Sequence, residues 1–216
     1  VTNEFQAAYD AGGRARGVMG LYFFDGQAGG QVLNNFFNLS FGDTQGQVYT
    51  ESVAAYADWT FDIGETLALS LGVRWTDEQK RAVVLNRAYS GPDFTTVVAV
   101  PANFDKTVGF TNLSPKVSLD YRLTPDILLY GLASRGFKSG GYNIRANATA
   151  VPRSAEPFDD EQVDSFEVGS KMALLDSRLF VNVAAFHNKY EDMQLSVFTE
   201  LPGGGFFGDF TNAGKG

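Results

Sequence analysis

Apolar and polar residues alternate with a period of two along much of the chain, which is typical of β-strands with two unlike faces. The clearest example is residues 66–76, where one row is apolar and the other is small or polar. The apolar row consists of Leu67, Leu69, Leu71, Val73 and Trp75. Residues 52–61 alternate in the same way, and the short turn at residues 62–65 joins the two segments. The pattern predicts a β-hairpin.

Two further hairpins are predicted downstream and one upstream. In the hairpin that turns at Thr124-Pro125-Asp126, Leu128, Tyr130 and Leu132 form the apolar row of the returning strand, opposite Gly131, Ala133 and Arg135. The next hairpin turns at residues 175–177, and Phe180 and Phe186 interrupt its alternation, which predicts either a bulge or lumen-facing aromatic rings. Residues 4–9 and 16–24 form an earlier pair whose faces the pattern leaves open. A further strand is expected from Phe206.

The predicted connections alternate in length. Short turns fall near residues 12, 63, 125 and 176, whereas long Gly-, Asn- and Pro-containing segments span residues 26–47, 81–108, 139–159 and 200–205. Compact soluble domains seldom carry repeated long loops without secondary structure. Outer-membrane barrels do, because their turns are short on the periplasmic side and their loops are long on the extracellular side.

The two rows of each strand fit two architectures. A soluble sandwich would bury the row of Leu67, Leu69, Leu71 and Val73, whereas a membrane barrel would turn it toward lipid and the polar row toward an aqueous lumen. The aromatic residues favour the barrel, because they lie toward strand ends, where interfacial girdles occur. These residues are Trp59, Phe61, Trp75, Tyr121 and Tyr130.

Composition narrows the class of protein. Aromatic residues make up 14% of the chain and Gly contributes 24 residues, which disfavours disorder and suits sheets with many turns. A formal net charge of -8 argues against nucleic acid as a partner. There is no cysteine, so neither disulfides nor thiolate chemistry can be built, and the single histidine, His187, rules out a His-rich metal site.

The chain is expected to be an internal piece of a longer protein. It holds no apolar run as long as a membrane helix requires. Its first residues, Val1-Thr2-Asn3-Glu4, do not resemble a signal peptide, and its last residues end without an obvious terminus.

Several segments, in matching order, resemble the barrel of the TonB-dependent receptors. The longest is the strand and Gly-rich loop from Tyr130 to Asn143, which read YGLASRGFKSGGYN. The others are residues 69–76, 113–121, 165–171, 184–190 with Met193-Gln194, and Asn212-Ala213-Gly214. Each is weak alone, but their order and spacing cover most of the chain from about Val48 onward.

The resemblance implies an all-β fold, an antiparallel up-and-down transmembrane β-barrel of about 22 strands with a plugged lumen. Residues 1–216 would supply about eight or nine strands of that single barrel domain, truncated at both ends, without the plug. It further implies a non-enzymatic receptor of the Gram-negative outer membrane that imports a scarce nutrient. A ferric siderophore is the expected cargo, and no cofactor is expected. Outer-membrane lipid and the TonB complex, reached through the missing N-terminal plug region, would be its partners.

Two sets of residues are candidates for function. Arg135, Phe137, Lys138, Tyr142 and Asn143 could contact an anionic ferric chelate, although strand capping, lipid head-group contact or packing is the simpler and favoured explanation. The second set consists of charges expected to face the lumen, where they would pair across strands and with the plug or line a translocation path. They are Arg74, Lys116, Asp120, Arg122, Glu167 and Lys171.

Other motifs have simpler interpretations. Residues 203–208 match G-x-G-x-x-G formally, but they follow Pro202 and lack the strand-to-helix context, which indicates a loop tip. His187 is expected to be structural or interfacial, and Asp159-Asp160-Glu161 to be a solvated loop rather than a Ca²⁺ site. A nucleophile elbow and a P-loop are both missing from the sequence.

Two alternatives remain open from the sequence. One is a smaller, self-contained eight-stranded membrane barrel with an adhesive or structural role. The other is a soluble β-sandwich that serves as a binding module or a hydrolase.

Overall fold

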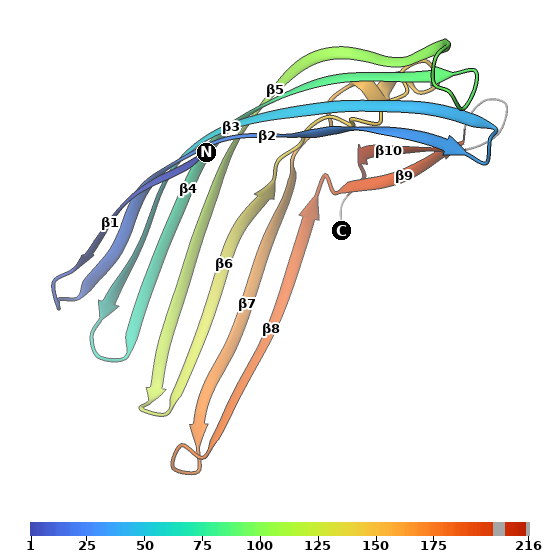
Figure 1. Cartoon of the computed structure of the whole chain (residues 1–216). Coiled ribbons are helices and arrows are strands. Elements are labelled where there is room, and N and C mark those ends of the chain that lie inside the picture. The colour runs from blue at the N-terminus through green and yellow to red at the C-terminus, as the bar shows by residue number, and fades with distance from the viewer. Residues whose placement is uncertain (201–205, 215–216) are drawn as a thin grey trace.

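The computed structural model describes residues 1–200 and 206–214. Eight strands form one antiparallel sheet in which the order in space is the order in sequence. Each strand therefore pairs with the strands that precede and follow it in the sequence. The sheet curves like a section of a barrel wall (Figure 1). The strands are β1 (Thr2–Asp10), β2 (Ala15–Phe36), β3 (Ser40–Ile63), β4 (Leu67–Tyr89), β5 (Val97–Thr124), β6 (Ile127–Lys138), β7 (Glu161–Leu174) and β8 (Leu179–Glu191).

A second, two-stranded sheet follows, made of β9 (Gln194–Glu200) and β10 (Phe206–Asn212). The predicted strand from Phe206 is confirmed, whereas β9 was missed by the sequence pattern. Between β6 and β7 the chain makes a long connection that contains one short 3-10 helix, η1 (Pro152–Ala155).

Two of the long loops expected from the sequence are wrong. Residues 26–47 belong to β2 and β3, which pair without a break as far as Phe36 and Ser40. Residues 81–108 are largely strand as well, because β4 and β5 pair up to Tyr89 and Val97. Residues 27–36 of β2 are exposed on both faces, so the backbone ladder continues there without any alternation of apolar side chains. Figure 1 shows β2 to β5 running well beyond the other strands and arching over.

The face assignment of β6 is also wrong. Leu119 of β5 lies opposite Gly131, and Asp120 lies opposite Tyr130. Leu128, Tyr130 and Leu132 therefore share the face of the polar row, and Gly131, Ala133 and Arg135 continue the apolar row. Since Gly131 and Ala133 occupy the middle of the outer row, the larger side chains of Tyr130 and Leu132 led to the opposite assignment from the sequence.

The interruption at Phe180 and Phe186 is not a bulge. Strands β7 and β8 pair residue for residue from Gln162 and Glu191 to Leu174 and Leu179. Phe186 lies opposite Glu167, so these rings sit on the same face as the polar row, where both are 70% exposed. The second of the two sequence interpretations, lumen-facing aromatic rings, holds.

The sheet thus has two unlike faces. The outer face is defined as the one that carries Leu69, Leu71 and Val73, and the inner face as the one that carries Arg74 and Lys116. The exposed fraction is 46% for Leu71 and 44% for Val73, and it reaches 62% for Val168 of β7. In the described part of the chain, therefore, this apolar face is not covered by a second layer of protein, which a soluble sandwich would require.

The apolar rows of the outer face have the length of a membrane band. From Leu67 to Trp75 and from Leu113 to Tyr121, each row rises about 26 Å along its strand, or about 20 Å at a tilt near 40°. This is comparable to the apolar band of an outer-membrane barrel, which is about 25 Å tall. Polar residues follow on the outer face of β4, beginning with Asp77 and Gln79.

Aromatic rings gather at the turn end of this band. The ring of Trp59 lies 5.8 Å from that of Tyr9 and 6.4 Å from that of Phe61. Tyr130 does not belong to this group, because it lies on the inner face. Among the described residues, the structure contains no helix that is long and apolar enough to cross a membrane.

Candidate functional site

The inner wall is lined by charged side chains that pair across strands. All six charges expected to face the lumen occupy the inner face: Arg74, Lys116, Asp120, Arg122, Glu167 and Lys171. Lys116 lies 3.0 Å from Asp58 of β3, and the hydroxyl of Tyr130 donates to Glu167 at 2.5 Å. These contacts tie neighbouring strands together side by side and make the wall stiff.

The connection from residue 139 to residue 159 folds back against the inner wall (Figure 1), and here it is called the shelf. Three side chains of the wall hold its backbone carbonyls. Lys80 donates to the carbonyl of Gly140 at 2.9 Å, Asn86 to that of Ala146 at 2.8 Å, and Lys106 to that of Ala155 at 3.0 Å. Because these donors satisfy carbonyls that strand pairing leaves free, the shelf is fixed to the wall despite having little secondary structure.

An apolar cluster lies between the shelf and the wall. Ala82 and Val84 of β4 and Ala102 of β5 are almost fully buried, and Ala146 and Ala155 of the shelf pack against them. The packing is close, since a Cβ added at Gly140 would lie 2.6 Å from the ring of Phe110 of β5. The shelf is therefore a packed layer of the protein on the inner wall.

The β9–β10 hairpin is attached to the shelf through a buried carboxylate. The side chain of Asp209 is 1% exposed, and one of its oxygens accepts from Arg153 at 3.1 Å. Asn143 donates toward Asp209 and toward the carbonyl of Gly208, each at 3.4 Å. The rings of Phe158 and Phe210 stack beside this network at 5.9 Å.

Two amide side chains close the junction between the strands and the shelf. Gln194 donates to the carbonyls of Ser139 and Asp159, both at 3.0 Å. Asn212 donates to the carbonyl of Asp159 at 2.9 Å and accepts from its N–H at 2.7 Å. In the sequence, Met193-Gln194 and Asn212-Ala213-Gly214 carry only the family resemblance, and the structure shows that the amides of Gln194 and Asn212 hold the junction.

The five candidate ligand residues do not share one surface. Arg135 lies on the outer face, where it pairs with Asp164 at 2.7 Å, and Phe137 follows on the same side. Lys138 ends β6 with its side chain on the inner side. Tyr142 packs against Phe104 at 5.8 Å, and burial raises the pKa of its hydroxyl. Asn143 is 4% exposed, within the Asp209 network.

The structure also shows where the other sequence motifs lie. His187 lies opposite Phe166 on the outer face. Asp159 serves the junction through its backbone. Residues 203–205 of the residue 203–208 motif lie outside the described residues, and residues 206–208 belong to β10. Within the described ranges, three or more His, Asp or Glu side chains are nowhere grouped as a metal site.

Comparison with known proteins connects this architecture to a family. All of residues 1–216 match the family model described as "TonB dependent receptor-like, beta-barrel". A pesticin receptor of Yersinia enterocolitica is 28% identical over 181 residues, which are 82% of this chain and 24% of the relative. The metal-pseudopaline receptor CntO of Pseudomonas aeruginosa is 32% identical over 80 residues, 37% of this chain and 10% of the relative.

Solved structures show the same fold. The crystal structure of the ferric yersiniabactin uptake receptor FyuA from Yersinia pestis aligns with a TM-score of 0.74 at 22% identity, over 99% of this chain and 30% of that one. The ferric-catecholate import receptor Fiu of E. coli in its closed form aligns with a TM-score of 0.62 at 18% identity, over 96% of this chain and 33% of that one. The chain thus spans about a quarter of the length of the curated relatives that it matches first.

Proposed function

The chain belongs to the TonB-dependent receptor β-barrel family, and from this premise we propose that it is part of an outer-membrane importer of a ferric siderophore. Members of this family are receptors and transporters rather than enzymes. Residues 1–216 would form one section of a single barrel domain, whose remaining strands and plug lie elsewhere in the intact protein.

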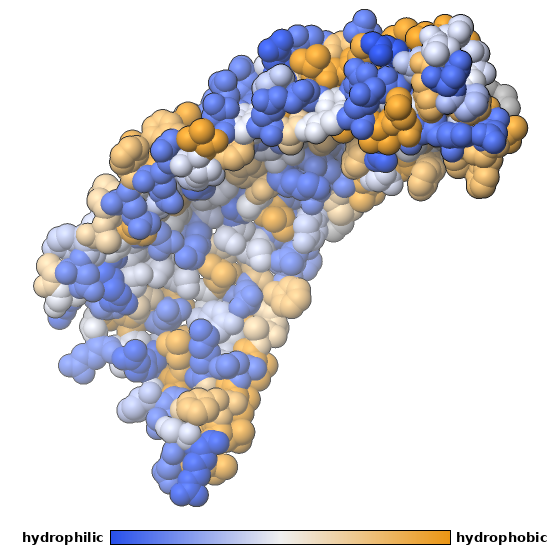
Figure 2. Space-filling model, viewed as in Figure 1, coloured by the Kyte–Doolittle hydropathy of each residue, from blue (hydrophilic) through white to orange (hydrophobic). Residues whose placement is uncertain are grey.

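The proposal rests on the difference in polarity between the two faces of the sheet. Large apolar residues are exposed on the outer face, whereas ion pairs and hydrogen bonds line the inner face. A lipid-facing exterior around a wet lumen requires this arrangement. Figure 2 shows apolar and polar side chains interspersed over the same curved sheet, with polar groups prominent near the hairpin turns.

The choice of cargo rests on the relatives. The pesticin receptor, the metal-pseudopaline receptor and the ferric yersiniabactin receptor are all similar to this chain, and two of these names specify a metal complex. We infer that the cargo is an iron chelate and that it is captured by the walls of the extracellular vestibule. Those walls include the shelf and the arched β2 to β5. Energy for release into the periplasm would come from the TonB complex through the plug.

Transport assays test this proposal. The intact gene is expressed in a Gram-negative strain that lacks its own siderophore receptors, and growth is measured under iron limitation with a panel of ferric chelates. We expect at least one chelate to restore growth in a TonB-dependent manner. If the receptor is present in the outer-membrane fraction and every chelate fails, the siderophore assignment is wrong.

A further inference from the structure

One cation of the inner wall, Arg74, lies against two aromatic rings from neighbouring strands. The guanidinium carbon of Arg74 lies 5.2 Å from the ring centre of Tyr22 and 5.7 Å from that of Tyr56. Its Nε donates to the hydroxyl of Thr76 at 3.3 Å. The two tyrosines come from β2 and β3, so three adjacent strands build the arrangement. Such contacts hold a planar guanidinium in place without neutralising its charge.

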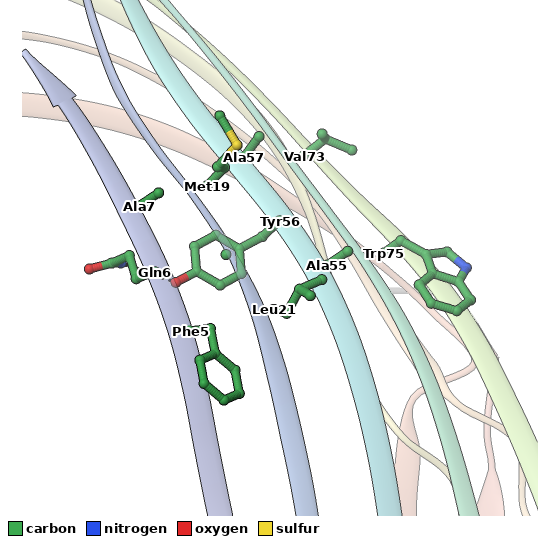
Figure 3. Close-up of a pocket in the computed structure, with 11 residues that line it drawn as sticks. Phe5, Gln6, Ala7, Met19, Leu21, Ala55, Tyr56, Ala57, Val73 and Trp75 are labelled. Atoms are coloured by element: carbon green, nitrogen blue, oxygen red, sulfur yellow. Dashed lines mark hydrogen bonds between the residues drawn. The ribbon is translucent and has the colours of Figure 1, made fainter.

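The ring of Tyr56 is itself fixed by the strands beneath it. A Cβ at Gly20 would lie 2.6 Å from the hydroxyl oxygen of Tyr56, so this glycine makes room for the ring. The hydroxyl donates to Glu4 and accepts from the amide of Gln6 at 3.0 Å. Figure 3 shows Tyr56 reaching across β2 with its hydroxyl next to Gln6. The position of the ring is therefore determined before any ligand arrives.

Two other cations on this face have carboxylate partners. Lys116 pairs with Asp58 at 3.0 Å, and Arg16 pairs with Asp62 at 2.5 Å. Within the described ranges, no carboxylate lies within ion-pair distance of Arg74, whose polar contact is to a neutral hydroxyl. The terminal nitrogens of its guanidinium are thus available to an oxyanion, which a guanidinium binds with two parallel hydrogen bonds.

The height of Arg74 in the wall suits contact with cargo. The next residue, Trp75, ends the apolar row of the outer face, and Asp77 begins the polar residues above it. Arg74 therefore lies on the lumen side, near the level where the wall leaves the lipid. The shelf is held higher on the same strand, at Lys80 and Asn86.

We propose that Arg74, clamped by Tyr22 and Tyr56, is an anion subsite that binds the carboxylate or phenolate oxygens of a negatively charged ferric chelate. The proposal rests on the proposed function and narrows its cargo to anionic chelates. The subsite provides charge, two hydrogen-bond donors and two aromatic faces against which a planar ligand can lie.

Binding to the intact receptor, with its own plug, tests the subsite. The probes are ferric citrate, a ferric tris-catecholate chelate and an uncharged ferric tris-hydroxamate chelate. Their affinity is measured by quenching of intrinsic fluorescence for the wild type, Arg74→Gln, Arg74→Lys and Lys116→Gln. The Lys116→Gln variant is the matched control, because it removes a paired cation from the same face.

We expect Arg74→Gln to weaken binding of an anionic chelate by at least about tenfold, as loss of a charge-assisted hydrogen-bond pair predicts. Binding of an uncharged chelate should change less than about twofold, and Lys116→Gln should bind as the wild type does. Arg74→Lys should bind the anionic chelate several-fold more weakly than the wild type, because an ammonium cannot offer the planar pair of donors. The Arg74→Lys variant also tests the subsite if Arg74→Gln fails to insert into the outer membrane.

The outcomes separate this proposal from the proposed function. If the wild type binds none of the probes, the siderophore function fails and the subsite fails with it. If the wild type binds an anionic chelate and the Arg74 variants bind it equally well, the subsite alone is wrong. It is also wrong if the wild type binds the hydroxamate chelate alone, or if Lys116→Gln weakens binding as much. If the Arg74 variants lose thermal stability and bind all probes more weakly to the same extent, Arg74 pairs with an acidic group of the plug. The subsite is then wrong as well.

Discussion

At the scale of residues, cations and carboxylates mostly neutralise one another across neighbouring strands. Lys116 with Asp58 and Arg135 with Asp164 illustrate this on the two faces of the sheet. Exposed pairs of this kind contribute little stability each, so their main effect is to fix side-chain positions and strand register. Against this background, an arginine held by aromatic rings rather than by a carboxylate is informative.

The pair of Arg81 and Asp105 gives a prediction about pH. Two guanidinium nitrogens of Arg81 donate to the two oxygens of Asp105 at 2.7 and 2.5 Å, and this holds the pKa of Asp105 below its ordinary value. Because the folded-state pKa is depressed, the stabilisation is complete above the ordinary pKa and is lost as pH falls through the lower one.

We therefore expect the carboxyl of Asp105 to titrate at a lower pH in the wild type than in Arg81→Gln. Carbon NMR of receptor labelled at aspartate would measure both midpoints. Lys189→Gln, which removes a cation from the more distant β8, should leave the midpoint of Asp105 unchanged. Equal midpoints in the wild type and Arg81→Gln would show that the pair does not form.

At the scale of elements, the sequence predicts strands well where one face must be apolar. The segment around Leu67 to Thr76 has a large apolar residue at every second position, so its strand, its turn and its two faces were all correct. In β6 the middle of the apolar row is Gly131 and Ala133, while Tyr130 and Leu132 lie on the inner face. Here pairing with β5 and β7, rather than hydrophobicity, determines which residues face outward.

The extensions of β2 to β5 also show where the sequence pattern fails to predict strands. Residues 26–47 are rich in Gly, Gln and Asn and carry no clear alternation. Strand pairing depends on backbone hydrogen bonds, and where both faces are exposed, as at residues 27–36, it leaves little trace in the sequence. The shelf was correctly predicted as a long connection, but its attachment through Asn86 and Asp209 could not be foreseen, because these contacts join residues far apart in the chain.

The attachment of the β9–β10 hairpin can be tested at Asp209. Replacement by alanine removes the buried acceptor for Arg153 and Asn143, which should cost about 1–3 kcal/mol locally because the buried amide of Asn143 loses a partner. We expect faster hydrogen–deuterium exchange in the shelf and in β10, with little change in β3 to β5. The amide of Phe210, which donates to Asp209 at 2.9 Å, should show the largest change.

A matched control is available within the shelf. Glu156 pairs with Lys106 at 2.9 Å, but its side chain is 63% exposed, so Glu156→Gln should alter exchange very little. If Asp209→Ala also left exchange in the shelf unchanged, the buried carboxylate would not be what holds the hairpin.

At the scale of the whole molecule, β1 and β8 are the two edges of the eight-stranded sheet. In the described part of the chain, the strands therefore do not close on themselves, as a self-contained eight-stranded barrel would require. Open edges within a bilayer leave backbone groups unsatisfied, so under the proposed function we expect further strands of the intact barrel to pair with them. The family match over the full chain agrees with a section of a larger wall.

The central claim is that the outer face contacts lipid while the inner face lines water. Because the sequence contains no cysteine, single cysteines placed in turn from Leu67 to Thr76 can carry a nitroxide label in the intact receptor in bilayers. The measurement is the accessibility of each label to oxygen, which partitions into lipid, and to a water-soluble paramagnetic nickel complex. We predict that labels at Leu69, Leu71 and Val73 respond to oxygen, while those at Ser70 and Arg74 respond to nickel. Uniform accessibility to nickel, or an alternation of the opposite phase, would contradict the account.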